Sequence, residues 1–181
     1  MVGRLKPETA EIKLVTVPTL KSRPYGMVTS SKSIPFFVEF GSNKIASIDP
    51  DTMAIREYVL PHDESRPRRV AITSDDVIWY SDYFRGYLGR YDPATGKASE
   101  WASPGGPQSQ PYGIVAVNDV IWYSEVGVAP NTVVCFDPKT KKFQTGKFLR
   151  GRRPAQREFD KKRQHRDRCS GVKRIGLVKL N

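Results

Sequence analysis

Three acidic residues recur at one place in a repeating pattern of the 181-residue sequence. Glu39, Asp82 and Glu125 lie 43 residues apart, and each ends a short aromatic run. Carboxylate oxygens are the ligands that hard divalent cations prefer, usually with waters completing the shell. An acid that recurs in every repeat can equally accept hydrogen bonds from a neighbouring backbone or from an arginine. We therefore consider these three acids either as weak candidate metal ligands or as structural acceptors.

A second set of polar residues follows a proline in each repeat. Tyr25 and Tyr112 stand in "PYG" sequences. In the middle repeat, Arg68 and Arg69 replace the Tyr-Gly pair. Tyrosine and arginine together can hold an anionic or carbonyl-bearing ligand through charge-assisted hydrogen bonds. In the alternative interpretation, the arginines are only surface charges that bridge to Asp82.

These residues are positioned by an internal repeat of short apolar and aromatic runs. The Asp-Pro steps that begin at Asp49, Asp92 and Asp137 are spaced 43 and 45 residues apart. Each repeat holds four runs separated by turns, and Asp-Pro at a type I turn joins the third run to the fourth. Four short antiparallel strands in such a period are typical of a β-propeller blade. Because an ordinary β-sandwich lacks this long period, the sequence predicts an all-β propeller of four-stranded antiparallel blades.

The repeat divides the chain into about three complete blades and two partial ones. We predict blades over 19–61, 62–105 and 106–145, with outer strands of incomplete blades at 1–18 and 170–181. Both ends supply outer strands and so cannot complete one another, and we expect an open arc cut from a larger ring. Met1 falls inside a blade, which suggests a truncated gene or a misassigned start. Uncovered blade faces favour self-association.

The innermost strand of each blade is expected to be the first, which lines the central channel of a propeller. Tyr25, Arg68, Arg69 and Tyr112 are therefore candidate ligand-binding residues at the channel mouth. A small-molecule ligand is the partner that such a site implies.

Much of the net charge of +11 comes from one segment. Residues 146–168 contain ten Lys or Arg against three acidic residues. The segment 146–169 has the length of the missing strands but shows neither their motifs nor their alternation. Two compensating frameshifts would explain this pattern, and a solvated native loop is the second interpretation. Nucleic-acid binding is the least favoured, because only Phe148 and Phe159 offer stacking surfaces.

Composition excludes several other classes of protein. The hydrophobic fraction of 38% and aromatic fraction of 10% are typical of a globular chain. The apolar runs are too short for a transmembrane helix, so we expect no membrane partner. The N-terminal residues lack the apolar stretch of a signal peptide, which places the chain as written in the cytoplasm. Cys135 and Cys169 provide neither a disulfide framework nor metal-ligand spacing.

The repeated motifs together resemble the virginiamycin B lyase (streptogramin lyase) family. They are "PYGI" at 111–114, "IWYSE" at 121–125, "NKIASI" at 43–48, "YLGRYDPATGKASEW" at 87–101 and "EYVLP" at 57–61. One motif alone would be a weak signal, but their repetition in register is specific. The resemblance covers residues 1 to about 145 and 172–178. It implies a seven-bladed propeller that acts as a Mg²⁺-assisted lyase on a cyclic depsipeptide antibiotic, and hence a role in antibiotic resistance.

The chain departs from this family at the position of the catalytic residue. In the lyases a histidine occupies the second position of the Pro-x-Gly-Ile motif, where this chain has Tyr25, Arg68 and Tyr112. His62 falls in an inter-blade loop and His165 in the basic segment, so neither matches. An imidazole transfers protons near neutral pH, whereas tyrosine and arginine normally do not.

The resemblance leaves two functions open. In the first, the chain is a catalytically inactive fragment of a lyase-like propeller whose intact relatives bind or cleave a small cyclic or lactone-type molecule at the channel mouth. In the second, it is a non-catalytic propeller that binds a small ligand or a protein. The resemblance implies Mg²⁺ as the one cofactor, with Glu39, Asp82 and Glu125 at the positions of the family's strand-two carboxylates. Intact relatives can be exported, so the original compartment stays open.

Overall fold

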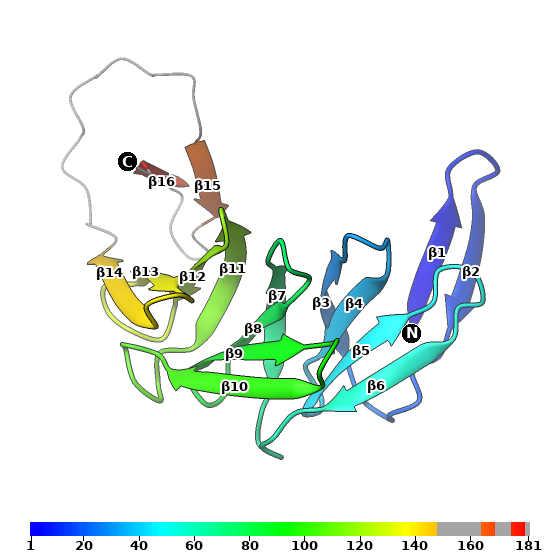
Figure 1. The fold of residues 1–181 in the computed structure, drawn as a ribbon, viewed down its shortest axis with the longest axis horizontal. Coiled ribbons are helices and arrows are strands. Elements are labelled where there is room, and N and C mark those ends of the chain that lie inside the picture. Colours follow the sequence, from blue (N-terminus) through cyan, green and yellow to red (C-terminus); the bar gives the residue numbers. More distant parts are fainter. Residues whose placement is uncertain (148–163, 169–174, 180–181) are drawn as a thin grey trace.

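The computed structural model describes residues 1–147, 164–168 and 175–179, and every regular element in them is a β-strand. The strands form three four-stranded antiparallel sheets and two two-stranded sheets. None of the described residues belongs to a helix that is long and apolar enough to cross a membrane. The described sheets follow one another along an open arc (Figure 1). The prediction of an all-β propeller with three complete and two partial blades is confirmed.

Each complete blade contains four consecutive strands in chain order. The first blade has β3 (Pro24–Thr29), β4 (Pro35–Glu39), β5 (Lys44–Ile48) and β6 (Ile55–Val59); the second has β7 (Pro67–Ile72), β8 (Ile78–Asp82), β9 (Tyr87–Asp92) and β10 (Lys97–Ala102); the third has β11 (Pro111–Val117), β12 (Val120–Glu125), β13 (Thr132–Asp137) and β14 (Lys142–Lys147). The two-stranded sheets pair β1 (Val2–Lys6) with β2 (Glu11–Val15), and β15 (Gln164–Arg168) with β16 (Ile175–Lys179).

The basic segment predicted at 146–169 contributes part of β14 and the whole of β15. Its other residues lie outside the described part of the chain, so the hypothesis of two frameshifts stays a prediction.

The first strand of each complete blade lies on the inner side of the arc, and the fourth lies on the outer side (Figure 1). Strand β7 contacts both β3 and β11. The residues that begin these three strands are therefore brought close together from distant parts of the sequence.

The predicted Asp-Pro turns occupy equivalent places in the three blades. Asp92 and Asp137 are the last residues of β9 and β13, and Asp49 directly follows β5. A carboxylate oxygen of each accepts a hydrogen bond from a backbone N–H two or three residues later, at 2.8–3.0 Å. This local acceptor explains why an aspartate begins each of these turns.

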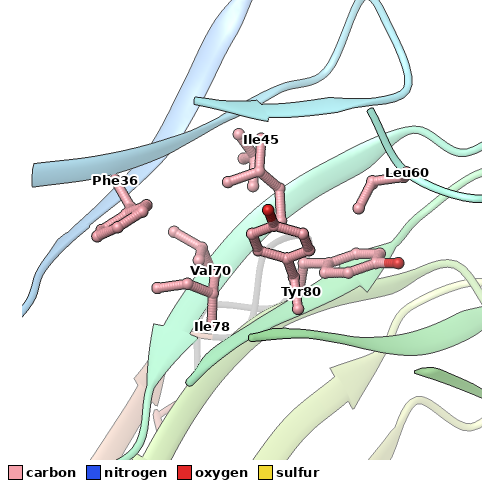
Figure 2. Close-up of a cluster of buried hydrophobic side chains, with 8 residues drawn as sticks. Phe36, Ile45, Leu60, Val70, Ile78 and Tyr80 are labelled. Atoms are coloured by element: carbon pink, nitrogen blue, oxygen red, sulfur yellow. The ribbon is translucent and has the colours of Figure 1, made fainter. Parts of the chain in front are cut away.

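The hydrophobic core lies between neighbouring blades, because alternate residues of a strand face opposite sides of its sheet. In β4, Phe36 and Val38 pack toward the second blade, whereas Phe37 packs toward β1 and β2. Figure 2 shows the first of these interfaces, where Phe36, Ile45 and Leu60 meet Val70, Ile78 and Tyr80.

Aromatic rings dominate the interface between the second and third blades. Trp79 stacks on Trp101 with ring centroids 5.6 Å apart, and Trp101 lies 4.9 Å from Phe136. Phe136 in turn lies 4.7 Å from Phe143 of the outermost strand. Such ring pairs add to the hydrophobic burial and fix how one blade sits on the next.

A hydrogen-bonded clasp repeats between successive blades, at the turns that join their first and second strands. Asp76 accepts the backbone N–H of Ser31 at 2.7 Å and its hydroxyl at 2.6 Å. Asp119 accepts the same two groups from Ser74 at the same distances. Hydrogen bonds from the serines lower the pKa values of Asp76 and Asp119. The clasps add a charge-assisted contact to the two apolar interfaces between complete blades.

Gly89 in β9 is required by the close approach of an aromatic ring. Tyr80 lies opposite Gly89 in the pairing of β8 with β9, and a Cβ atom on residue 89 would overlap the Tyr80 ring. Tyr80 is fully buried and donates a hydrogen bond to Glu100 at 2.9 Å. The ring is thus held on both sides and cannot move aside freely.

We predict that Gly89→Ala destabilises the protein by about 1–3 kcal/mol, the usual cost of overpacking a core. Chemical denaturation followed by tryptophan fluorescence measures this change. Gly146→Ala in β14 is the matched control, because no described atom lies within 4 Å of its Cβ position. Equal effects of the two substitutions would show that the Tyr80 contact does not restrict residue 89.

We also predict that the clasps make the protein less stable in acid. Folding lowers the pKa values of Asp76 and Asp119, so their stabilising effect is complete above the unfolded pKa of about 3.9 and is lost as the pH falls through the folded values. The double variant Asp76→Asn, Asp119→Asn should therefore lose less stability than the wild type on acidification. Urea midpoints measured from about pH 6 to about pH 2 test this. Asp51→Asn, at an exposed position outside the clasps, should follow the wild type.

Candidate functional site

A β-bulge in the first strand of each blade positions the candidate ligand-binding residues. The pairing of β3, β7 and β11 with the second strand slips directly after the proline that begins each strand. Tyr25, Arg68 and Tyr112 fall inside these slips. Because a bulge bends its strand and re-aims a side chain, the same position is turned out of the regular pleat in all three blades.

Backbone contacts hold the three bulges next to one another. A Cβ atom on Gly26 would lie only 3.0 Å from the Cα of Arg69, so the glycine lets β3 approach β7 closely. On the other side, the Ser81 hydroxyl donates to the carbonyl of Tyr112 at 3.0 Å and accepts the N–H of Arg69 at 3.1 Å. The positions of the three strands are thus set by contacts that do not involve the candidate side chains.

The guanidinium group of Arg68 lies among four aromatic rings. Its Cζ is 4.3 Å from the ring centroid of Tyr83 and 4.6 Å from that of Tyr112. The rings of Phe40 and Tyr25 lie at 5.1 and 5.3 Å. Cation–π attraction is stronger where the cation is partly removed from water. The side chain of Arg68 is half-buried and meets this condition. We call the following six residues the Arg–Tyr cluster: Tyr25, Phe40, Arg68, Arg69, Tyr83 and Tyr112.

Two phenol hydroxyls and the second arginine form the exposed part of the Arg–Tyr cluster. The hydroxyls of Tyr25 and Tyr112 are 3.2 Å apart. The Cζ of Arg69 lies 4.9 Å from the Tyr25 centroid and 5.4 Å from the Tyr112 centroid. The hydrogen bond with Tyr25 and the contact with Arg69 lower the pKa of Tyr112. All four candidate ligand-binding residues therefore meet at one place, although they come from three blades.

The alternative interpretation of the arginines, as surface charges bridged to Asp82, is wrong. Asp82 pairs with Arg85 at 3.2 Å, and Arg85 also pairs with Glu100 at 3.0 Å. Among the described residues, neither Arg68 nor Arg69 has an acid within ion-pair distance. The Nε of Arg68 is buried without a hydrogen-bond acceptor in the same part of the chain. The two charges are thus not neutralised by a described side chain.

The three candidate metal ligands lie in separate blades, each buried at the end of the second strand. Asp82 accepts two backbone N–H groups and the side chain of Arg85. Glu125 accepts the hydroxyl of Ser103 and the N–H of Gly105, both at 2.7 Å. Both carboxylates therefore act as acceptors that tie a loop to the end of the strand.

Glu39 differs from the other two acids because one of its carboxylate oxygens is buried and unpaired in the described part of the chain. Its Oε2 accepts the Ser42 hydroxyl at 2.9 Å, whereas its Oε1 is buried without a partner in the described part of the chain. Burial raises the pKa of Glu39, which disfavours its charged form.

The three acids do not fit a shared Mg²⁺ site. Each already accepts hydrogen bonds from nearby loop residues, whereas Mg²⁺ needs several oxygens in a near-octahedral arrangement. No group of three His, Cys, Asp or Glu side chains that could hold a metal occurs among the described residues. These observations favour the structural role for Glu39, Asp82 and Glu125.

Phe40 and Tyr83 were not identified from the sequence as part of the Arg–Tyr cluster. Each directly follows the acid that ends the second strand of its blade, where the third blade has Val126. Tyr83 also donates a hydrogen bond to Gln110 at 3.1 Å, which links the second blade to the third. Their shared position after the acid is the signal that could have found them.

His62, the one histidine whose side chain the structure describes, lies outside the Arg–Tyr cluster. The Nε2 of His62 lies 3.3 Å from Glu100, which also accepts the hydrogen bond from Tyr80 and pairs with Arg85. His165 stands in β15, and its side chain is not among those described.

Solved structures of virginiamycin B lyases share this arrangement of blades. The selenomethionine-substituted enzyme from Staphylococcus aureus has 29% sequence identity and a TM-score of 0.72, with 80% of this chain and 47% of that chain covered. A catalytically inactive histidine-to-alanine variant from the same organism, with quinupristin, has 28% identity and a TM-score of 0.72, with 81% and 48% covered. A streptogramin B lyase structure has 23% identity and a TM-score of 0.70, with 80% and 47% covered. The chain spans about half the length of these relatives.

The family assignment rests on the sequence match together with these structures. No curated protein matches the sequence. A sequence model of the Virginiamycin B lyase family matches residues 1–135, which include the first two complete blades and most of the third. The chain therefore belongs to the virginiamycin B lyase family.

Proposed function

We propose that this chain binds a small molecule at the Arg–Tyr cluster and does not open the streptogramin ring. The observation that carries the proposal is the convergence of three blades on one cluster. The hydroxyl of Tyr25 from the first blade is 3.2 Å from that of Tyr112 in the third, and Arg68 and Arg69 come from the blade between them. Small-molecule sites are typically lined by apolar and aromatic side chains together with a small number of polar groups.

The accessibility of the Arg–Tyr cluster supports a role in binding. Arg69 and Tyr25 are exposed, and Tyr25 keeps 44% of its surface accessible. A ligand can therefore contact the guanidinium fork of Arg69 and the phenol hydroxyls without a rearrangement of the blades. Because the backbone of β7 is fixed by Gly26 and Ser81, these groups are held ready before a ligand binds.

The residue types at the bulges argue against the lyase reaction. A general acid or base works best when its pKa lies near the working pH, as that of histidine does. The positions of Tyr25, Arg68 and Tyr112 supply phenols and a guanidinium instead. In the proposed function these groups orient a ligand by hydrogen bonds and do not move a proton.

A relative of known structure supports the separation of binding from catalysis. The histidine-to-alanine variant of the Staphylococcus aureus enzyme is catalytically inactive, and its structure was solved with quinupristin. A propeller of this family can thus hold its ligand after the loss of a histidine. The proposal for this chain does not require Mg²⁺, because its candidate ligands hold loops to strand ends.

We predict that the full chain does not open quinupristin when Mg²⁺ is present. Among the side chains that the structure describes, no histidine lies in the Arg–Tyr cluster, so proton transfer there at neutral pH lacks its usual group. Reversed-phase chromatography separates the ring from the opened product, and the Staphylococcus aureus enzyme is the positive control. Turnover above the sample without protein that disappears in Tyr112→Phe would contradict the prediction and make Tyr112 catalytic.

We predict that Tyr112→Ala abolishes binding of small molecules to the chain. Tyr112 contributes both a ring beside Arg68 and one of the paired hydroxyls. Ligand-detected NMR with quinupristin and with small neutral amides and carboxylates measures binding. Phe84→Ala is the matched control, because Phe84 is 67% exposed and lies outside the Arg–Tyr cluster. The absence of binding by every compound would contradict the proposed function.

A further inference from the structure

We infer that the ligand of the Arg–Tyr cluster is an organic carboxylate attached to an apolar or aromatic group. This inference rests on the proposed function and names the chemical class of the ligand. The first observation is the charge of the cluster, since Arg68 and Arg69 bring two positive charges to the meeting point of three blades. Within the described residues, neither has an ion-pair partner, and the acids Asp82 and Glu100 are paired with Arg85.

Arg68 is held by the surrounding rings as a fixed cation. Four aromatic rings lie within 5.3 Å of its Cζ, and its buried Nε finds no acceptor among the described residues. Rings attract the cation but do not neutralise it. A charge that is partly shielded from water attracts an anion more strongly than one in bulk solvent. Arg68 thus provides a positive electrostatic potential, not neutralised by the rings, beneath the exposed part of the cluster.

Arg69 and the phenol hydroxyls provide the donors that a carboxylate needs. The guanidinium group of Arg69 is exposed, and its planar fork matches the two oxygens of a carboxylate. In the Tyr25–Tyr112 pair one hydroxyl donates to the other, which leaves the second O–H free to donate to a ligand.

The surroundings favour an organic carboxylate over inorganic phosphate. Phosphate sites commonly use several free backbone N–H groups in a concave loop. At these bulges the N–H groups of Arg69 and Gly113 already donate to the hydroxyls of Ser81 and Ser124. The rings of Tyr25 and Tyr112 instead offer apolar surface, which only a ligand with an organic body can use.

Titration of the full chain with phenylacetate and with its neutral analogue phenylacetamide tests the inference. Isothermal calorimetry should show phenylacetate binding roughly tenfold to a hundredfold more tightly, as expected for hydrogen bonds to a charged group. Arg69→Gln should remove most of this difference, because only the charge of Arg68 then remains, and Arg69→Lys, which keeps the charge and loses the fork, should reduce it less. Arg56→Gln is the matched control, because Arg56 is exposed and lies 5.2 Å over the ring of Tyr58, outside the cluster. Thermal melts establish that each variant is folded.

The outcomes separate this inference from the proposed function. Equal binding of phenylacetate and phenylacetamide would overturn the inference and leave a small-molecule site in place. Binding of neither compound, nor of any compound in the NMR test, would overturn both. Tighter binding of inorganic phosphate than of phenylacetate would replace the carboxylate by a phosphate ligand. A loss in Arg56→Gln equal to that in Arg69→Gln would show that binding follows overall charge, and it would also overturn the inference.

Discussion

A blade of this propeller cannot bury its side chains by itself, and the structure depends on the contact between one blade and the next. Alternate residues of β4 face opposite sides of the sheet, so Phe36 packs toward the second blade and Phe37 toward β1 and β2. The same holds in β8, where Tyr80 packs toward the first blade and Trp79 toward the third. Apolar burial across these interfaces is therefore the main source of both stability and geometry.

The Arg–Tyr cluster is a consequence of this packing. Its tyrosines come from the first, second and third blades, and no single blade contains enough of it to surround the guanidinium group of Arg68. Buried interfaces such as that of Trp79 with Phe136 set the angle between blades, and Gly26 and Ser81 set the final approach of the inner strands. A site built in this way responds to changes in the core far from it.

Much of the fold followed from the sequence because its pattern is periodic. The Asp-Pro turns and the alternation of the strands are local signals, and their repetition fixed the number of complete blades. The site was predicted less completely, because the contacts of a side chain depend on where its strand bends. The repeat in the sequence placed Tyr25, Arg68 and Tyr112 at one position and Arg69 at the next, but the sequence suggested Asp82 as a partner for the arginines. In the structure, Asp82 forms an ion pair with Arg85. Arg68 is instead surrounded by aromatic rings, and two of these belong to Phe40 and Tyr83, which the repeat pattern did not single out.

The bulges also separate the scaffold of the site from its chemistry. The inner strands are held together by the backbone N–H of Arg69, the carbonyl of Tyr112 and the absence of a side chain at Gly26. The side chain after each proline therefore contributes little to the packing of one inner strand against the next. That position can accept different residues in different blades, as the change from tyrosine to arginine in the second blade illustrates. During evolution such a propeller can consequently change its ligand specificity one blade at a time, because each substitution leaves the backbone contacts between the blades unchanged.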